Sequence, residues 1–209
     1  MQDTDRKLTA AEMRRKELFE ATEADLAAQG YREHRLTMGV VAANVFALAL
    51  AIPLDILLGV GFFALHPGLS IEFGFGGAIG VILVFFALIV VHELIHGLVW
   101  SMFAKRRWKS VSFGFILQYL TPYCTCNEPL PRFAYVIGAL APTIVLGLIP
   151  VAVAYATGSP VLFVIGALMI IGGGGDMAIV IKMLRFKPEG AEALYLDHPY
   201  ELGLVVFER

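Results

Sequence analysis

The sequence has few charged residues and very few cysteines for its length. Only 16% of the 209 residues are Asp, Glu, Lys or Arg, whereas 58% are hydrophobic, a balance far from that of a soluble globular domain. The 16 basic and 18 acidic residues give a net charge of −2, so the chain lacks the basic surplus typical of nucleic-acid-binding proteins. Cys124 and Cys126 are the only cysteines, and we expect free thiols because residues this close make a strained disulfide. A soluble enzyme and a nucleic-acid partner are therefore disfavoured.

Four apolar stretches are long enough to cross a lipid bilayer, which takes about 20 residues of helix. They cover residues 37–65, 77–103, 133–156 and 161–184. The first follows a mostly polar segment and is longer than the apolar region of a signal peptide, so we expect it to remain in the protein. The sequence thus predicts an all-α membrane protein with four transmembrane helices, in contact with the lipid bilayer.

The basic residues are distributed unevenly between the connections. Seven of the Lys and Arg residues precede the first stretch, five lie between the second and third, and four lie at or beyond the end of the fourth. Because basic residues concentrate on the cytoplasmic side, both termini and the 104–132 loop are predicted to be cytoplasmic. The expected organisation is a cytoplasmic N-terminal segment (1–36), a membrane domain (37–184) and a cytoplasmic C-terminal tail (185–209).

Two cytoplasmic segments show local structure. A capping-box pattern from Thr9 to Glu12 predicts a short, solvated helix in the N-terminal segment. Residues 109–123 first alternate polar and apolar residues and then favour β-structure, which predicts a β-hairpin or a re-entrant element between the second and third helices. Such a hairpin could pair with an extended substrate through its edge, or could simply cover the helix ends.

The second apolar stretch contains an HExxH motif, with His92, Glu93 and His96 as its polar members. On a helix the two imidazoles share one face and can bind one zinc ion, while the Glu can act as general base on a water molecule. Placing three ionisable groups of an apolar helix in a bilayer costs free energy unless a partner group or ion compensates their charge. A divalent ion would do so. The alternative is a pair of core histidines hydrogen-bonded to neighbouring helices, in a proton relay.

A third ligand should lie at the same depth, because a catalytic zinc ion usually has three protein ligands. His96 lies nine residues before Lys105, and Asp176 lies nine before Arg185, so both are expected about 14 Å from the cytoplasmic boundary. Asp176 follows a run of four glycines that would permit close helix packing. The alternative is a glycine packing patch with an incidental Asp.

Two further residues fall at this depth. Asn44 lies nine residues after Arg35, and it could donate a hydrogen bond to the oxyanion of a tetrahedral intermediate or serve only in helix packing. Pro142 is expected to distort the third helix rather than to contact substrate.

The sequence resembles the intramembrane metalloproteases of the site-2 protease type and, more closely, the bacterial putative zincin peptidases. The resemblance rests on residues 92–97 (HELIHG), the later Gly175-Asp176, and the segments 112–115, 123–124 and 141–142, and it covers roughly residues 85–180. It implies a zinc cofactor, a peptide or membrane-protein substrate, and a bacterial cell membrane as the location. It also implies that the metal is held by His92, His96 and Asp176 and that Glu93 is the catalytic base. Phe113 and Phe115, in the segment 112–115, are further candidate oxyanion or substrate contacts beside Asn44.

The chain departs from the larger site-2 proteases in two respects. It has Gly-Gly-Asp-Met where they have an Asn-Pro-Asp-Gly or Leu-Asp-Gly box, which leaves the oxyanion donor unassigned. We also expect no periplasmic substrate-selecting domain within these residues. The interpretation is therefore a membrane-embedded zinc metalloprotease acting in or near the bilayer, with a metal-binding transporter or a scaffold as alternatives. The substrate, a regulatory or degradative role, and the oligomeric state do not follow from the sequence.

Overall fold

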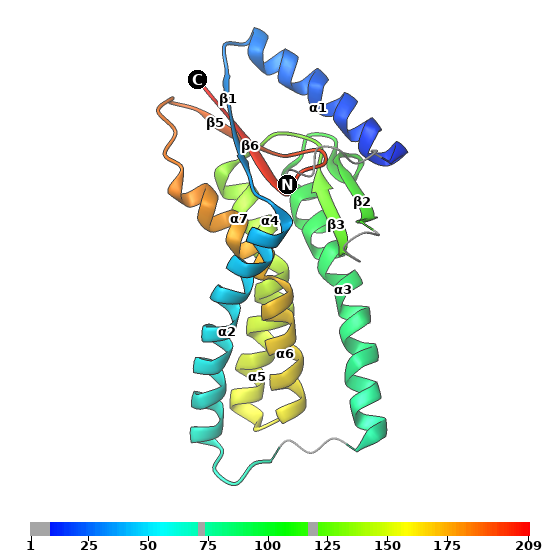
Figure 1. Cartoon of the computed structure of the whole chain (residues 1–209), viewed down its shortest axis with the longest axis vertical. Helices are drawn as coiled ribbons and strands as arrows, with labels where there is room; N and C mark the ends of the chain where they lie inside the picture. Colours follow the sequence, from blue (N-terminus) through cyan, green and yellow to red (C-terminus); the bar gives the residue numbers. More distant parts are fainter. Residues whose placement is uncertain (1–8, 71–73, 117–120) are drawn as a thin grey trace.

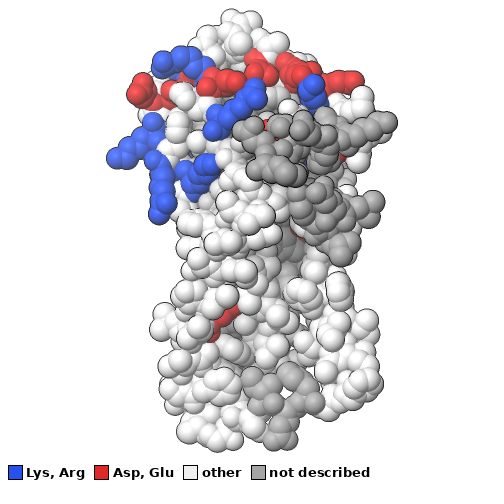
Figure 2. Space-filling model, viewed as in Figure 1, with Lys and Arg blue, Asp and Glu red and all other residues white. Residues whose placement is uncertain are grey.

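The molecule is elongated, and its charged side chains gather at one end. The computed structural model describes residues 9–70, 74–116 and 121–209. Long helices run along the molecule, whereas a short helix, two β-sheets and the C-terminus lie at one end (Figure 1). On the face seen in Figure 2, nearly all charged side chains lie at this same end, which we call the polar end.

The apolar stretches expected from the sequence are helical. They correspond to α2 (Val40–Leu65), α3 (Phe75–Phe103), the continuous run of α4 (Arg132–Pro142), η4 (Thr143–Leu148) and α5 (Ile149–Thr157), and the pair α6 (Pro160–Gly172) and α7 (Gly174–Arg185). The first three are long and apolar enough to cross a membrane, and the α6–α7 pair qualifies only when taken together, with a bend of 47°. The described residues thus contain three or four candidate membrane spans.

Two irregularities interrupt these helices, and they pack on each other. The π-helical segment η4 begins directly after Pro142, whose missing N–H and ring disturb regular α-helical bonding, as expected for this residue. Gly173 separates α6 from α7, and a Cβ atom at Gly173 would overlap the Thr143 hydroxyl in η4. The break therefore requires a residue without a side chain.

A four-stranded antiparallel sheet at the polar end was not predicted from the sequence. Its strand order is β1-β6-β5-β4, with β1 (Arg32–Thr37), β4 (Leu130–Pro131), β5 (Ala193–Asp197) and β6 (Gly203–Glu208). The expectation of an all-α fold is therefore incomplete, because both segments that flank the long apolar helices contribute strands. β6 is buried along its whole length, so it lacks the alternation by which a half-buried strand is recognised.

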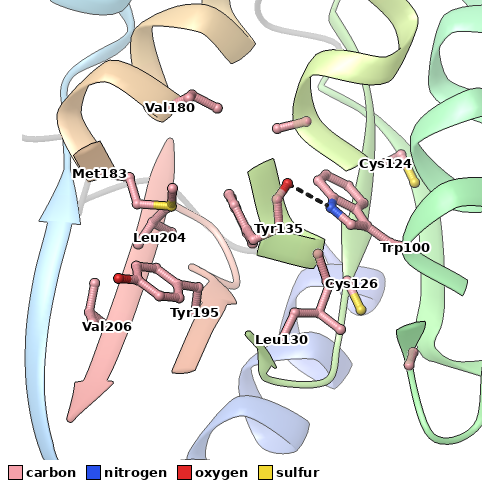
Figure 3. Packing of buried hydrophobic residues seen from close by; sticks show 13 residues of the cluster. Trp100, Cys124, Cys126, Leu130, Tyr135, Val180, Met183, Tyr195, Leu204 and Val206 are labelled. Atoms are coloured by element: carbon pink, nitrogen blue, oxygen red, sulfur yellow. Dashed lines mark hydrogen bonds between the residues drawn. The ribbon is translucent and has the colours of Figure 1, made fainter. Parts of the chain in front are cut away.

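The two faces of this sheet pack against different helices. One face joins the core between α4 and α7 (Figure 3), which includes Tyr195, Leu204, Val206, Val180 and Met183. The opposite face packs against α1 (Ala10–Ala28) through Leu196, Val205 and Phe207 of the sheet and Phe19 and Leu26 of the helix. The capping box at Thr9 is present, but α1 is a packed helix and not the solvated one expected.

The hairpin predicted between the second and third long helices is present. β2 (Val111–Ile116) pairs antiparallel with β3 (Thr121–Cys126), with Phe113 opposite Cys124. Residues 117–120 of the predicted segment lie outside the described residues, as do residues 1–8 of the N-terminal segment. The hairpin contacts the polar half of α3, where the HExxH motif lies.

Candidate metal centre

Three side chains of metal-ligand type converge near the helix breaks. His92 Nε2 lies 3.1 Å from Asp176 Oδ2, and His96 Nε2 lies 3.4 Å from the same oxygen. The candidate ligand atoms all lie within 4.8 Å of one another. His92 and His96 are 6% and 3% exposed, whereas the Asp176 side chain is 25% exposed. The structure thus brings together the three residues that the sequence suggested as ligands.

Two helices position these ligands. His92 and His96 lie one turn apart on α3, with ring centroids 4.8 Å apart. Asp176 lies in the first turn of α7, directly after the break. A Cβ atom on Gly174 would lie 2.9 Å from the Ala47 Cβ of α2, so small residues on both helices allow α7 to approach.

The orientation of His96 is fixed by α4 and by its own helix. His96 Nδ1 lies 2.8 Å from the carbonyl oxygen of Gly138, and because a carbonyl only accepts, Nδ1 carries the proton. The ring stacks on Trp100 with centroids 5.0 Å apart and an interplanar angle of 15°. Trp100 in turn donates to the carbonyl of Tyr135 (Figure 3). His96 Nε2 is therefore the nitrogen left to face Asp176.

Glu93 faces the hairpin on the other side. The backbone amide of Cys124 in β3 lies close to the Glu93 carboxylate. The hairpin can approach because Gly97 has no side chain, since a Cβ atom there would lie 2.6 Å from the Phe113 ring and 3.0 Å from Val111 Cγ1. The glycine after the motif thus creates the space in which β3 reaches the motif.

The donor set fits a zinc ion. With Nδ1 protonated, Nε2 of a neutral His96 and the Asp176 carboxylate are both acceptors, and two acceptors this close need a proton or a metal cation between them. Ligand atoms at 2.0–2.1 Å from one zinc ion lie about 3.3 Å apart at the tetrahedral angle, against the 3.1 and 3.4 Å of the two His–Asp pairs. Three protein ligands also leave a coordination position open, as in catalytic zinc sites.

A cavity of about 570 Å³ adjoins these residues, a size typical of ligand sites. Its apolar wall comes from α2 and the end of α6, including Val40, Ala43, Ala47, Leu48 and Ile171. Its polar wall comes from α1, β3, the end of β5 and the 198–202 loop between β5 and β6. Asn44 lines the same cavity as Glu93 and the three candidate ligands.

Phe113 and Phe115 lie elsewhere. Neither of these described residues is among those that line the cavity. The Phe113 ring lies next to Gly97 and at 5.6 Å from the Trp108 ring, centroid to centroid, whereas Phe115 is 50% exposed. Phe113 thus influences the site through the packing of the hairpin on α3. A direct contact with the substrate or the oxyanion would have to come from another residue.

The outer edge of β3 offers few hydrogen-bond donors to a substrate. Asn127 N donates to Ser110 O, which fixes the register, so that residues 122, 124 and 126 point their backbone groups away from β2. Residue 122 is proline and has no N–H, and Cys126 donates to Asp197. Two of the three positions on this edge of β3 therefore offer no free donor, and a full ladder with an added strand cannot form there.

The two cysteines are free and buried. Burial raises the pKa of both thiols, that of Cys126 to about 12. A neutral thiol is a poor metal ligand, and the cluster of candidate ligands found among the described residues includes neither cysteine. Their contacts with Leu130 and Tyr135 place them in the core between the hairpin and α4.

Three residues that complete the site were missed from the sequence: Tyr135, Gly138 and Asp197. Gly138 supplies the carbonyl that orients His96, and Tyr135 donates from its hydroxyl to Asp197. None belongs to a motif with its own spacing. Asp197 was regarded as part of a tail, and only the pairing of β5 with β6 reveals its position.

The comparisons with known proteins agree with this geometry. A family model described as "Putative zincin peptidase" matches residues 85–191, which is 107 of the 209 residues. The match begins within α3 before the HExxH motif and ends after α7, so it includes all three candidate ligands. No curated protein and no solved structure matches the chain.

Proposed function

The chain belongs to the family of putative zincin peptidases, and we propose that it is a membrane-embedded zinc metalloprotease that hydrolyses a peptide bond in or near the bilayer. Membership of a zincin family implies a zinc cofactor and metallopeptidase activity. The observation that carries the proposal is the convergence of His92, His96 and Asp176 beside Glu93 in one cavity.

The residues have separate roles in this proposal. His92, His96 and Asp176 hold the metal, which when bound supplies Lewis acidity that polarises a substrate carbonyl and acidifies a water molecule. The Glu93 carboxylate takes the proton of the attacking water and delivers it to the nitrogen of the leaving amine. The Asn44 side chain lines the cavity and is our candidate donor to the developing oxyanion.

The distribution of charge and apolar surface supports a membrane location. The candidate spans carry many exposed large apolar side chains, such as Val41, Leu57, Phe75 and Phe86, each more than 60% exposed. Exposed apolar surface on this scale is costly in water and suits lipid. The Lys and Arg side chains gather at the polar end (Figure 2), so we place this end, with both termini, in the cytoplasm of a bacterial cell.

The proposed likeness to site-2 proteases rests on two features of the site. The HExxH motif lies in a long apolar helix, and the carboxylate ligand comes from a second helix that is broken just before it. In the proposed orientation the cavity lies at the cytoplasmic side of the bilayer, because α1 and the 198–202 loop contribute to one of its walls.

A cleavage assay with the full-length protein tests this function. The probe is a set of synthetic peptides that each carry a 20-residue apolar segment with lysine flanks, and fragments are identified by mass spectrometry. We expect new fragments from the wild type and none from Glu93→Gln, which should retain about one zinc ion per chain because Glu93 is not a ligand. Leu94→Ala is the matched control, since Leu94 lies in the same turn but is 44% exposed.

Three results would overturn the proposal. Identical fragments from the wild type and Glu93→Gln would show that Glu93 is not the base. A wild type that binds zinc, cleaves no peptide and moves zinc across liposomes would favour the transporter alternative, whereas a protein without zinc or cleavage would favour the scaffold.

A further inference from the structure

The two key residues of the motif are oriented by elements outside their own helix. His96 is held by the Gly138 carbonyl of α4, and Glu93 lies close to the Cys124 amide of β3. Their relative orientation therefore depends on how α4 and β3 sit with respect to each other. Cys124 and Cys126 pack in one core cluster with Tyr135, and among the hydrogen bonds of the described residues one side chain links the two elements.

That side chain is Asp197, the last residue of β5. Its Oδ1 accepts a hydrogen bond of 2.5 Å from the Tyr135 hydroxyl, and its Oδ2 accepts one of 2.9 Å from the Cys126 amide. Tyr135 lies three residues before Gly138, about one turn of α4. Cys126 lies two residues after Cys124, on the same edge of β3. Each bond thus ends next to the group that orients one of the motif residues.

We infer that Asp197 is a positioning residue of the metal centre: by bridging Tyr135 and Cys126, it fixes α4 and β3 so that His96 and Glu93 keep their productive orientations. Asp197 lies beyond residues 85–191, the segment that matches the family. The part of the inference that concerns cleavage rests on the proposed function, whereas the part that concerns metal affinity does not.

The bridge is not needed to hold the sheet together. The backbone of Asp197 already pairs with Leu204 in the β5–β6 ladder, so the side chain is free to bond outward. Glu208 offers a contrast within the same sheet. It is 1% exposed, and its carboxylate binds His34 and the backbone amides of Glu189 and Gly190, none of which lines the cavity. A substitution of Glu208 therefore shows whether the loss of any buried carboxylate in this sheet changes zinc binding.

The substitutions differ in the hydrogen bonds that they leave. Asp197→Ala removes both bonds, and Tyr135→Phe removes only one. Asp197→Asn can keep both, because its amide oxygen accepts from the Cys126 N–H and its amide nitrogen donates to the Tyr135 hydroxyl oxygen. If bridging is the role of Asp197, the Asn variant should behave like the wild type although the charge is lost.

The test measures zinc affinity of the full-length protein by competition with a chelator, together with the absorption spectrum of bound Co²⁺ and thermal unfolding. Loss of a group that supports a metal ligand typically weakens binding by about 10- to 100-fold. We expect a loss in this range for Asp197→Ala, with an altered Co²⁺ spectrum, a smaller loss for Tyr135→Phe, and near-normal binding for Asp197→Asn. Glu208→Gln should lower the unfolding temperature without changing zinc affinity.

Several outcomes would overturn the inference. Wild-type zinc affinity in both Asp197→Ala and Tyr135→Phe would show that the bridge does not position the ligands, as would an equal loss in Glu208→Gln. If Asp197→Ala does not fold, Tyr135→Phe, which deletes one hydroxyl, decides the result. Failure of the proposed function is distinguishable, because a wild type that cleaves no peptide can still show weaker zinc binding in the Tyr135 and Asp197 variants.

Discussion

His96 Nδ1 lies 2.8 Å from the carbonyl oxygen of Gly138, and the same glycine leaves the space that the Trp100 ring occupies. Because Trp100 stacks on His96, one residue of α4 acts on the histidine in two ways, through a hydrogen bond and through packing. The carbonyl determines which nitrogen of His96 faces the metal position, and the stacked indole limits rotation of the ring.

Gly138→Ala is therefore expected to weaken zinc binding by about 10- to 100-fold. A Cβ atom at this position would overlap the Trp100 indole, so that Trp100, and with it His96, must move. Overpacking of this kind also costs about 1–3 kcal/mol of stability. The measurement is zinc affinity by chelator competition, with thermal unfolding alongside.

Gly80→Ala is the matched control, because a Cβ atom at Gly80 in α3 meets no atom within 4 Å. This variant should bind zinc like the wild type. Unchanged zinc affinity in Gly138→Ala would mean that α4 can shift without disturbing His96. This result would contradict the orienting role that we assign to Gly138.

The sequence predicted the parts of this molecule that depend on local pattern. Long apolar stretches predicted the helices, and the spacing of His92 and His96 predicted a shared helix face. Counting residues from the nearest basic residue placed Asp176 at the level of His96, because both helices have the same rise per residue. Their proximity in the structure follows from that common geometry.

The residues that orient the motif could not be predicted in this way. The Gly138 carbonyl and the Cys124 amide are backbone groups, which any residue carries, so no residue type marks their role. Asp197 acts through β5, and β5 is recognisable only by its pairing with β6, which requires tertiary structure. Sequence patterns thus identified the groups that would contact the metal, and tertiary packing determined the groups that hold them.

Gly97→Ala is expected to reduce cleavage more than zinc binding. The added Cβ would press on Phe113 and Val111 and move the hairpin away from α3, which withdraws the Cys124 amide from Glu93. The candidate ligands lie on α3 and α7 and not on the hairpin, so movement of the hairpin should leave them in place. The zinc content should therefore stay close to one ion per chain. The measurements are the rate of peptide cleavage and the zinc content of the purified protein.

A second substitution tests this cause. Phe113 Cζ is the atom nearest to the new Cβ, at 2.6 Å, so Gly97→Ala combined with Phe113→Ala should recover part of the cleavage rate. No recovery in the double variant would show that Gly97→Ala acts on the helix itself and not through the hairpin.

Asp176→Ala is expected to weaken zinc binding by more than the roughly 10- to 100-fold typical of a supporting group, because it removes a ligand. Asp55→Ala is a suitable control, since Asp55 is also an acidic residue in an apolar helix but does not line the cavity. Zinc content and affinity are measured for both. Tight, stoichiometric zinc in Asp176→Ala would exclude Asp176 as a ligand.

The protonation of Asp197 is expected to make stability depend on pH. Burial raises the pKa of this carboxyl group from 3.8 to about 6, against the opposing effects of Tyr135, Cys126, His96 and Arg15. The folded state thus keeps a proton that the unfolded chain has already released, so this contribution to stability is present below pH 4 and is lost as the pH rises through 6. A pKa shift of this size changes the free energy of unfolding by up to about 3 kcal/mol.

Asp197→Asn cannot release a proton, and its predicted hydrogen bonds are the same at every pH. The free energy of unfolding of the zinc-loaded wild type, relative to this variant, should therefore fall between pH 4 and pH 6 and stay constant above pH 7. Denaturant unfolding in detergent at several pH values measures this difference, in which the contributions of the other titrating groups largely cancel. A difference that does not vary with pH would mean that Asp197 has the same pKa in the folded and unfolded chain, and its carboxylate would then be solvated rather than enclosed between α4 and β3.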